Sequence, residues 1–144
     1  MREMTVTIKR FDPDKDKEPY YQTYTVKVND GARVLNVLHA IHETIDPTLA
    51  YRYSCASGQC GSCAVLVNGK PVLACMEEAK DKSTIEPLNL PVKKDLMTDL
   101  VPRLAQMAHL MPKGTLVIPT KADIDAIKPL RDCIECLACV SVCP

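Results

Sequence analysis

The strongest limit on how this chain can fold comes from one group of cysteines. Four of them follow the spacing C-x4-C-x2-C-x11-C: Cys55, Cys60, Cys63 and Cys75. The leading C-x4-C-x2-C is the spacing of plant-type [2Fe–2S] sites. A cluster of two irons and two bridging sulfides needs four thiolates, and the loop must curl around it. The glycine, alanine and serine residues between the cysteines permit that curl. The sequence therefore predicts a [2Fe–2S] loop here.

Two other uses of these cysteines agree less well with the sequence. A structural zinc site usually takes two short cysteine pairs from separate turns, whereas three of these cysteines lie in one continuous glycine-containing loop. Disulfides belong to oxidising compartments, and the opening MREMTVTIKRFDPDKDKEPY lacks the apolar core of a signal peptide. Cluster ligation in a reducing compartment is the better interpretation.

A second group of cysteines lies in CIECLACVSVCP, with the spacing C-x2-C-x2-C-x3-C-P of bacterial ferredoxins. Its members are Cys133, Cys136, Cys139 and Cys143. The first three are regularly spaced, so one tight turn can present three thiolates to a [4Fe–4S] cluster. In two-cluster ferredoxins the fourth cysteine of such a run ligates a different cluster.

This second group leaves ligands unaccounted for, and two arrangements remain open. Either all four cysteines close on one cluster, or Cys143 serves a neighbouring cluster and the natural chain continues beyond Pro144. We expect the second arrangement, because a terminus directly after a ligand would expose the site to solvent and fraying.

The segments around the first cysteine group alternate between β and helical patterns. MTVTIKRF and YYQTYTVKV predict two strands joined by a charged loop, and residues 34–45 carry apolar side chains at helical spacing up to Asp46-Pro47. AVLVNGKPVL predicts a hairpin with an Asn-Gly turn, and STIEPLNLPV a further short strand. This order predicts the α+β class and a β-grasp fold, with the helix packed across a small mixed sheet.

From Lys93 the pattern changes. KKDLMTDLVPRLAQMAHLMP predicts a helix that Pro102 kinks or restarts, and KGTLVIPTKADIDAIKPLRD predicts a linker with a short helix. We therefore expect two domains. A [2Fe–2S] β-grasp domain would cover residues 1–95, and the start of a helical [4Fe–4S] ferredoxin-type domain, incomplete at its C-terminus, would cover 96–144.

Composition excludes other classes of protein. Lysine plus arginine equals aspartate plus glutamate at 18 each, so no basic field indicates a nucleic-acid partner. No apolar run approaches the roughly 18 residues of a membrane-spanning helix. No histidine adjoins a cysteine as Rieske-type ligation would need, so we interpret His39, His42 and His109 as structural. We expect a cytoplasmic protein, or one held at the cytoplasmic face of a membrane by its partners.

Taken together, these motifs resemble the iron–sulfur subunits of succinate dehydrogenases and fumarate reductases. DPTLAYRYSCASGQCGSCAVLVNGKPVLAC is similar to that family's [2Fe–2S] loop almost position for position, including the short gap before Cys75. IEPLNLPVKKDLMTDL is similar to the segment that leaves the first domain, and the last cysteine run to the second-domain motif. The resemblance covers essentially the whole chain, although Pro102 to Leu130 matches only loosely.

The resemblance implies an electron-transfer subunit with no substrate chemistry and no catalytic residue of its own. It would relay single electrons between a second redox site, a quinone, and a partner flavoprotein that carries FAD and interconverts succinate and fumarate. A membrane anchor subunit would be a further partner. By the same resemblance, the first cysteine group would hold a [2Fe–2S] cluster. Cys133, Cys136 and Cys139 would hold a [4Fe–4S] cluster with a later cysteine. Cys143 would hold a third cluster, [3Fe–4S] or [4Fe–4S], with later cysteines.

Two alternatives stay open at this point. The methanogen thiol:fumarate reductase has a B subunit with a similar front half. Its later half resembles heterodisulfide reductase and takes electrons from the thiols coenzyme M and coenzyme B. A free-standing two-cluster ferredoxin would instead carry electrons between enzymes without a fixed partner.

Overall fold

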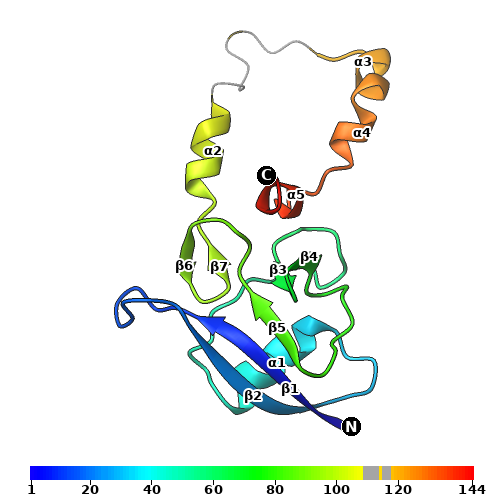
Figure 1. The fold of residues 1–144 in the computed structure, drawn as a ribbon. Coiled ribbons are helices and arrows are strands. Elements are labelled where there is room, and N and C mark those ends of the chain that lie inside the picture. The colour runs from blue at the N-terminus through cyan, green and yellow to red at the C-terminus, as the bar shows by residue number, and fades with distance from the viewer. Residues whose placement is uncertain (109–113, 115–117) are drawn as a thin grey trace.

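The first two strands form the hairpin that the sequence predicted. The computed structural model describes residues 1–108, 114 and 118–144. In it β1 (Arg2–Arg10) and β2 (Tyr20–Val28) pair antiparallel along their whole length. From Met4 onward alternate residues of β1 are buried, as expected for a strand that turns one face to the core. The charged loop between the strands extends away from the sheet (Figure 1).

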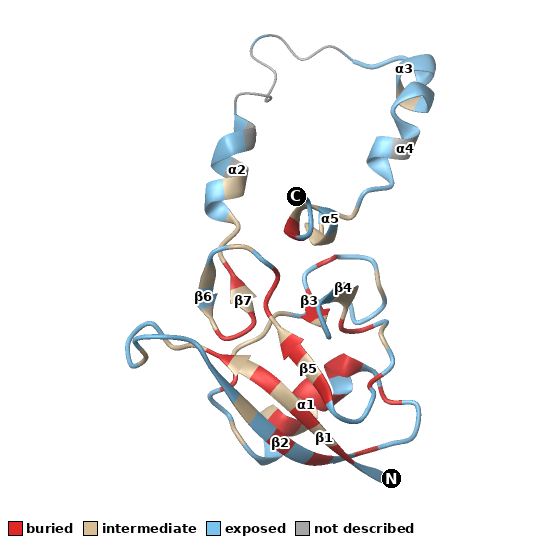
Figure 2. Cartoon of the chain, in the orientation of Figure 1, coloured by how far each residue is buried: buried red, intermediate tan, exposed pale blue. Residues whose placement is uncertain are grey.

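The predicted helix is α1 (Val34–Thr44), and it packs against the sheet. At its start the Asn36 side chain accepts the backbone N–H of Arg33 at 2.8 Å, and at its end the N–H groups of Ile45 and Asp46 both bond to the Ile41 carbonyl. The buried residues of α1 form one core cluster with those of β1 and β2 (Figure 2). They are Val34, Leu35, Val37, Leu38 and Ile41.

Three shorter strands complete a mixed five-stranded sheet, in the order β2-β1-β5-β3-β4. They are β3 (Ala64–Val67), β4 (Lys70–Leu73) and β5 (Ser83–Glu86). β5 runs parallel to β1, and the other pairs are antiparallel. The predicted hairpin at Asn68-Gly69 and the predicted α+β class are confirmed.

The prediction of a helix from Lys93 is wrong for its first residues. Residues there form a small hairpin of β6 (Val92–Lys94) and β7 (Met97–Thr98). The cause is Asp95, whose backbone turns through a φ of +46° and whose N–H bonds to the Phe11 carbonyl at 2.8 Å. A helix across this point would break that contact, so tertiary structure overrides the local pattern.

A helix does begin further on, at α2 (Val101–Met107), with Pro102 in its first turn. Proline is tolerated there because the first N–H groups of a helix have no intrahelical partner. The predicted restart at Pro102 is therefore confirmed. The rest of the expected helix, with His109, lies outside the described residues.

The last part of the chain contains three short helices: α3 (Lys121–Ala126), α4 (Lys128–Arg131) and α5 (Ala138–Ser141). Thr120 caps α3, since its hydroxyl accepts the Asp123 N–H at 3.3 Å. α5 returns to the first part of the molecule and contacts β4, whereas α3 and α4 lie away from the sheet (Figure 1). In the described part of the chain, no helix has both the length and the apolar character needed to cross a bilayer. The division into domains at residue 95 stays a prediction.

Candidate iron–sulfur sites

The first cysteine group lies in the loop between α1 and β3 and just after β4. Cys63 and Cys75 are buried, whereas Cys55 and Cys60 are exposed. The loop curls because its backbone enters the left-handed region three times, at Ala56, Gly58 and Gly61, with φ values of 52°, 76° and 71°. Glycine adopts such values without strain, which is why small, flexible residues were expected between these cysteines.

The Cys55 sulfur is surrounded by backbone donors. The N–H groups of Ser57, Gln59 and Cys60 point at it, with N···S distances of 3.4, 3.3 and 3.4 Å. These hydrogen bonds, chiefly that from Ser57, lower the pKa of the Cys55 thiol to about 6. The loop thus favours the thiolate, which is the form that binds metal.

The remaining cysteines of this group complete two pairs of thiols. The Ser62 hydroxyl lies 2.9 Å from the Cys60 sulfur and lowers its pKa, and Cys60 also interacts with Cys55. Burial raises the pKa of the Cys63 thiol, which interacts with Cys75. One exposed and one buried pair suit a diiron cluster, which takes two thiolates on each iron. Within the described residues, no three cysteine, histidine or acidic side chains gather around a point where a single metal ion could bind.

The second cysteine group lies between α4 and Pro144. Cys133 and Cys139 line a cavity of about 280 Å³ together with Leu137 and Val140. Cys136 is half-buried and lines a different cavity, and Cys143 is exposed beyond α5. The structure therefore brings Cys133 and Cys139 to one cavity and does not bring Cys136 or Cys143 to it.

The backbone around Cys136 is unusual on both sides. Glu135 and Leu137 have φ values of 54° and 59°. The left-handed region costs an L-residue about 1–2 kcal/mol. Such strain persists only where surrounding structure enforces it, and it gathers at functional sites. The turn at Cys136 is thus held by its contacts.

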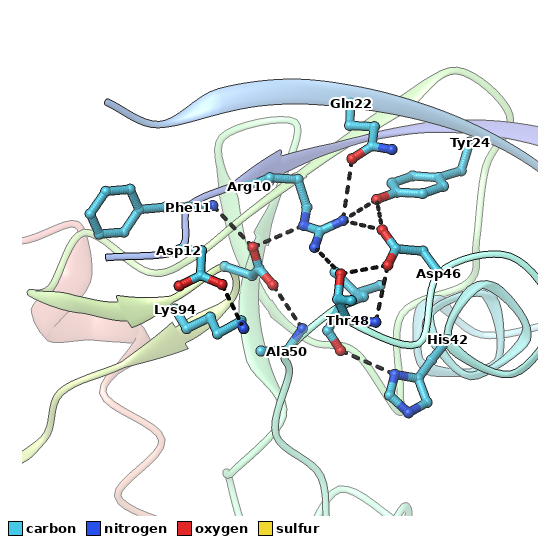
Figure 3. A network of polar contacts seen from close by, with 12 residues as sticks. Arg10, Phe11, Asp12, Gln22, Tyr24, His42, Asp46, Thr48, Ala50 and Lys94 are labelled. Carbon is cyan, nitrogen blue, oxygen red and sulfur yellow. Dashed lines mark hydrogen bonds and ion pairs between the residues drawn. The ribbon is translucent and has the colours of Figure 1, made fainter. Parts of the chain in front are cut away.

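A buried polar network holds the segment that leads into the first cysteine loop (Figure 3), and sequence analysis missed it. Asp95, with its side chain 1% exposed, accepts hydrogen bonds from Arg10 Nε at 2.8 Å and from the Ala50 N–H at 2.8 Å. Arg10 also contacts Asp46 and Tyr24. Single aspartates and arginines are mostly exposed, so nothing in the sequence distinguished these residues.

Two histidines support the same segment. His39 Nδ1 lies 2.8 Å from the Tyr51 hydroxyl, and His42 Nδ1 lies 3.1 Å from the Leu49 carbonyl oxygen. Their partners precede Cys55 by a few residues. Both contacts agree with the structural role expected of His39 and His42, which stays a prediction.

Comparison with known proteins decides the family. A family model described as "2Fe-2S iron-sulfur cluster binding domain" matches residues 5–104. The chain belongs to this family. The predicted [2Fe–2S] cofactor is thereby confirmed, and the matched residues include the whole first cysteine group.

Similarity to individual proteins extends over nearly all of the chain. It is 39% identical over 98% of its length to the B subunit of "Fumarate reductase (CoM/CoB)" of Methanothermobacter marburgensis. It is 39% identical over 95% of its length to "Succinate dehydrogenase iron-sulfur subunit" of Paracoccus denitrificans. Among solved structures, "Mycobacterium smegmatis Sdh1 complex in the apo form" matches 98% of the chain with a TM-score of 0.82 and 34% identity.

These matches confirm the resemblance that the sequence suggested, and they also show its extent. The chain spans 30% of the Methanothermobacter protein, 58% of the Paracoccus protein and 63% of the solved chain. The similarity therefore covers only part of each relative.

Proposed function

We propose that this chain is the electron-transfer iron–sulfur subunit of a succinate dehydrogenase/fumarate reductase-type complex. It relays single electrons between a partner flavoprotein, which carries FAD and the dicarboxylate site, and a second redox site that binds a quinone. One observation carries the proposal: a cysteine loop of the [2Fe–2S] family contacts a second run with [4Fe–4S] spacing. The similarity to the Paracoccus protein supports it.

The ligand assignment is part of the proposal. The first cysteine group holds the [2Fe–2S] cluster, and Cys133, Cys136 and Cys139 hold a [4Fe–4S] cluster. Cys143 serves a third cluster, [3Fe–4S] or [4Fe–4S]. The chain is divided into a [2Fe–2S] domain over 1–95 and a helical ferredoxin-type domain over 96–144.

The residues around the first cysteine group suit this role. Bound clusters would supply one-electron oxidation and reduction, which the side chains of a protein perform poorly. The three N–H groups on the Cys55 sulfur stabilise negative charge there, and hydrogen bonds of this kind tune cluster potentials. Burial of Cys63 and Cys75 keeps water from the inner half of the site.

The exposed half of the first loop is the face that we assign to the flavoprotein. Tyr53 and Met76 are 54% and 52% exposed, and Cys55 and Cys60 are exposed between them in sequence. Exposed aromatic and methionine side chains are enriched at protein interfaces. General acid–base chemistry on succinate and fumarate belongs to the partner, and a membrane anchor subunit would bind elsewhere.

A second candidate is a subunit of a thiol-linked fumarate reductase. The match to the Methanothermobacter "Fumarate reductase (CoM/CoB)" protein, at 39% identity over 98% of this chain, favours it specifically. In that case electrons arrive from the oxidation of two thiols, coenzyme M and coenzyme B, through a heterodisulfide-reductase-like module. The flavoprotein partner and the two cysteine sites keep the same roles.

Anaerobic isolation of the complete protein tests the proposal. We expect iron and acid-labile sulfide, the electron paramagnetic resonance (EPR) signal of a reduced diiron centre, and a co-purifying subunit that contains FAD. Zinc without sulfide would refute it. A monomer with complete clusters and no partner would instead indicate a free-standing ferredoxin. Fumarate reduction driven by a reduced quinone, or by the two thiols, separates the two candidates.

A further inference from the structure

At Gly61 the two cysteine runs, residues 55–63 and 133–143, approach each other very closely. A Cβ added to Gly61 would lie 2.7 Å from the Ile134 carbonyl oxygen, 2.8 Å from Cys136 Cβ and 2.9 Å from Cys136 Cα. Real Cβ atoms essentially never approach other atoms so closely. Two of these three are main-chain atoms, which no change of rotamer can move. Any residue other than glycine would push the second run away from the first.

A second contact holds the second cysteine run against the part of the chain that contains the first. The backbone N–H of Asn89 donates to the Ser141 hydroxyl at 2.9 Å, and its side-chain Nδ2 donates to the Ser141 carbonyl at 3.1 Å. Asn89 follows β5 in the first part of the chain, and Ser141, which is buried, ends α5. Asn89 therefore holds the second run at a point well separated from Gly61 in sequence.

Both runs also line one cavity. Cys60 and Cys136, one from each group, lie on the walls of a space of about 220 Å³ between the two parts of the chain. The left-handed residues Glu135 and Leu137 turn the backbone on either side of Cys136, and the Cα of Cys136 is one of the atoms that approach Gly61. The strained turn and the close approach are thus parts of one contact.

We propose that Gly61 and Asn89 are positioning residues that set the separation between the two cluster sites, and with it the rate of electron transfer between them. This inference rests on the proposed function. The step is the passage of one electron from the reduced centre to the oxidised centre, and no bond forms or breaks. Electron transfer slows steeply as two centres move apart, so a contact that fixes their separation also governs the rate.

A simpler explanation for Gly61 is that its positive φ alone requires glycine. Gly69 provides the matched control, because its φ of 77° resembles the 71° of Gly61 and an added Cβ there would meet nothing within 4 Å. The variants Gly61→Ala and Gly69→Ala therefore impose similar backbone strain, and only the first introduces a clash between the two runs.

The experiment uses the complete protein, isolated anaerobically with its accompanying subunits. Iron and sulfide are measured first. With both centres reduced, the spin relaxation of the diiron EPR signal then reports how close the neighbouring paramagnetic centre lies. We expect Gly61→Ala to keep its iron and sulfide and to lose most of the relaxation enhancement. Amide exchange over residues 133–141 should become about tenfold faster, as for the loss of one well-made contact. Gly69→Ala should match the wild type in both measurements.

Unchanged relaxation in a fully loaded Gly61→Ala protein would overturn the inference. If this variant fails to assemble the first cluster, Asn89→Ala decides, since Asn89 lies outside both cysteine loops. It removes the Nδ2 hydrogen bond to the Ser141 carbonyl and leaves that of the backbone N–H to the Ser141 hydroxyl. Slower relaxation and faster exchange would support the inference, and wild-type values would overturn it. A wild-type protein without iron and sulfide would refute the proposed function instead, and the exchange measurements would still test the contact.

Discussion

Replacing Asp95 is the sharpest test of how the first cysteine loop is held. Its carboxylate accepts three hydrogen bonds: Oδ1 from Arg10 Nε at 2.8 Å and from the Phe11 N–H at 3.0 Å, and Oδ2 from the Ala50 N–H at 2.8 Å. Ala50 stands five residues before Cys55. Asp95 therefore joins the end of β1 to the segment that enters the cluster loop.

The size of the effect follows from what each substitution leaves unpaired. Asp95→Ala leaves two backbone N–H groups without an acceptor, and each costs about 1–3 kcal/mol of stability. It also removes one partner of a buried ion pair, which typically costs about 3–5 kcal/mol. Arg10 keeps its contact with Asp46, and such terms overlap, so we expect a net loss of about 3–4 kcal/mol. Asp95→Asn keeps one acceptor but turns an NH₂ toward a backbone N–H, and about 1–3 kcal/mol should be lost.

The assay is the rate of cluster bleaching in urea under anaerobic conditions, because unfolding coupled to cofactor loss has no simple equilibrium. If the lost contacts are absent from the transition state, about 3 kcal/mol corresponds to bleaching about 100-fold faster in Asp95→Ala. Asp95→Asn should lie between that variant and the wild type.

Asp30→Ala serves as the control for this series. Asp30 has its side chain 80% exposed and pairs only loosely with the N-terminus, at 3.9 Å. It should bleach at the wild-type rate, because exposed ion pairs contribute little. Equal rates for Asp95→Ala and Asp30→Ala would refute the idea that the buried network holds the cluster loop.

Three further predictions follow from individual contacts. Cys63→Ser should abolish the diiron EPR signal, whereas Cys133→Ser should leave that signal intact and reduce iron content. Ser62→Ala removes the hydroxyl 2.9 Å from the Cys60 sulfur; since hydrogen bonds to sulfur raise cluster potentials, the midpoint of the diiron centre in a redox titration should fall. Burial opposes ionisation of Asp46, but hydrogen bonds from three side chains hold its pKa below the ordinary 3.8. The stabilisation that ionised Asp46 provides is complete above pH 3.8 and is lost as the pH falls below it. The difference in urea resistance between wild type and Asp46→Asn should therefore be constant from about pH 7 to about pH 5. It should shrink below about pH 4.

The parts of the fold that sequence analysis predicted are those that depend on local signals. Alternation in β1 and β2, helical spacing in α1 and the Asn68-Gly69 turn each act over a few neighbouring residues. The cysteine spacing of the first group is also local, because one loop has to wrap one cluster. Each of these elements could therefore be predicted from its own residues.

The features that the sequence predicted wrongly or did not reveal depend on contacts between distant segments. The hairpin β6–β7 replaces the expected start of a helix because Asp95 bonds to Phe11 and Ala50, far away in sequence. Similarly, Gly61 was interpreted only as a residue that lets the loop curl. Glycine is also required there because Cys136 lies so close, and that contact depends on a segment whose position no sequence pattern indicates.

The distribution of strain joins these observations. Among the described residues, six non-glycine residues have positive φ, and three of them neighbour cysteines: Ala56, Glu135 and Leu137. At about 1–2 kcal/mol each, this strain has to be offset by contacts that the same turns make. For Ala56 these include the N–H groups on the Cys55 sulfur; for Glu135 and Leu137 they include the contact between Cys136 and Gly61. The second cysteine run, with few buried residues of its own, therefore depends on the first part of the chain for its conformation, and the contact that orders it is also the one that places the two candidate sites together.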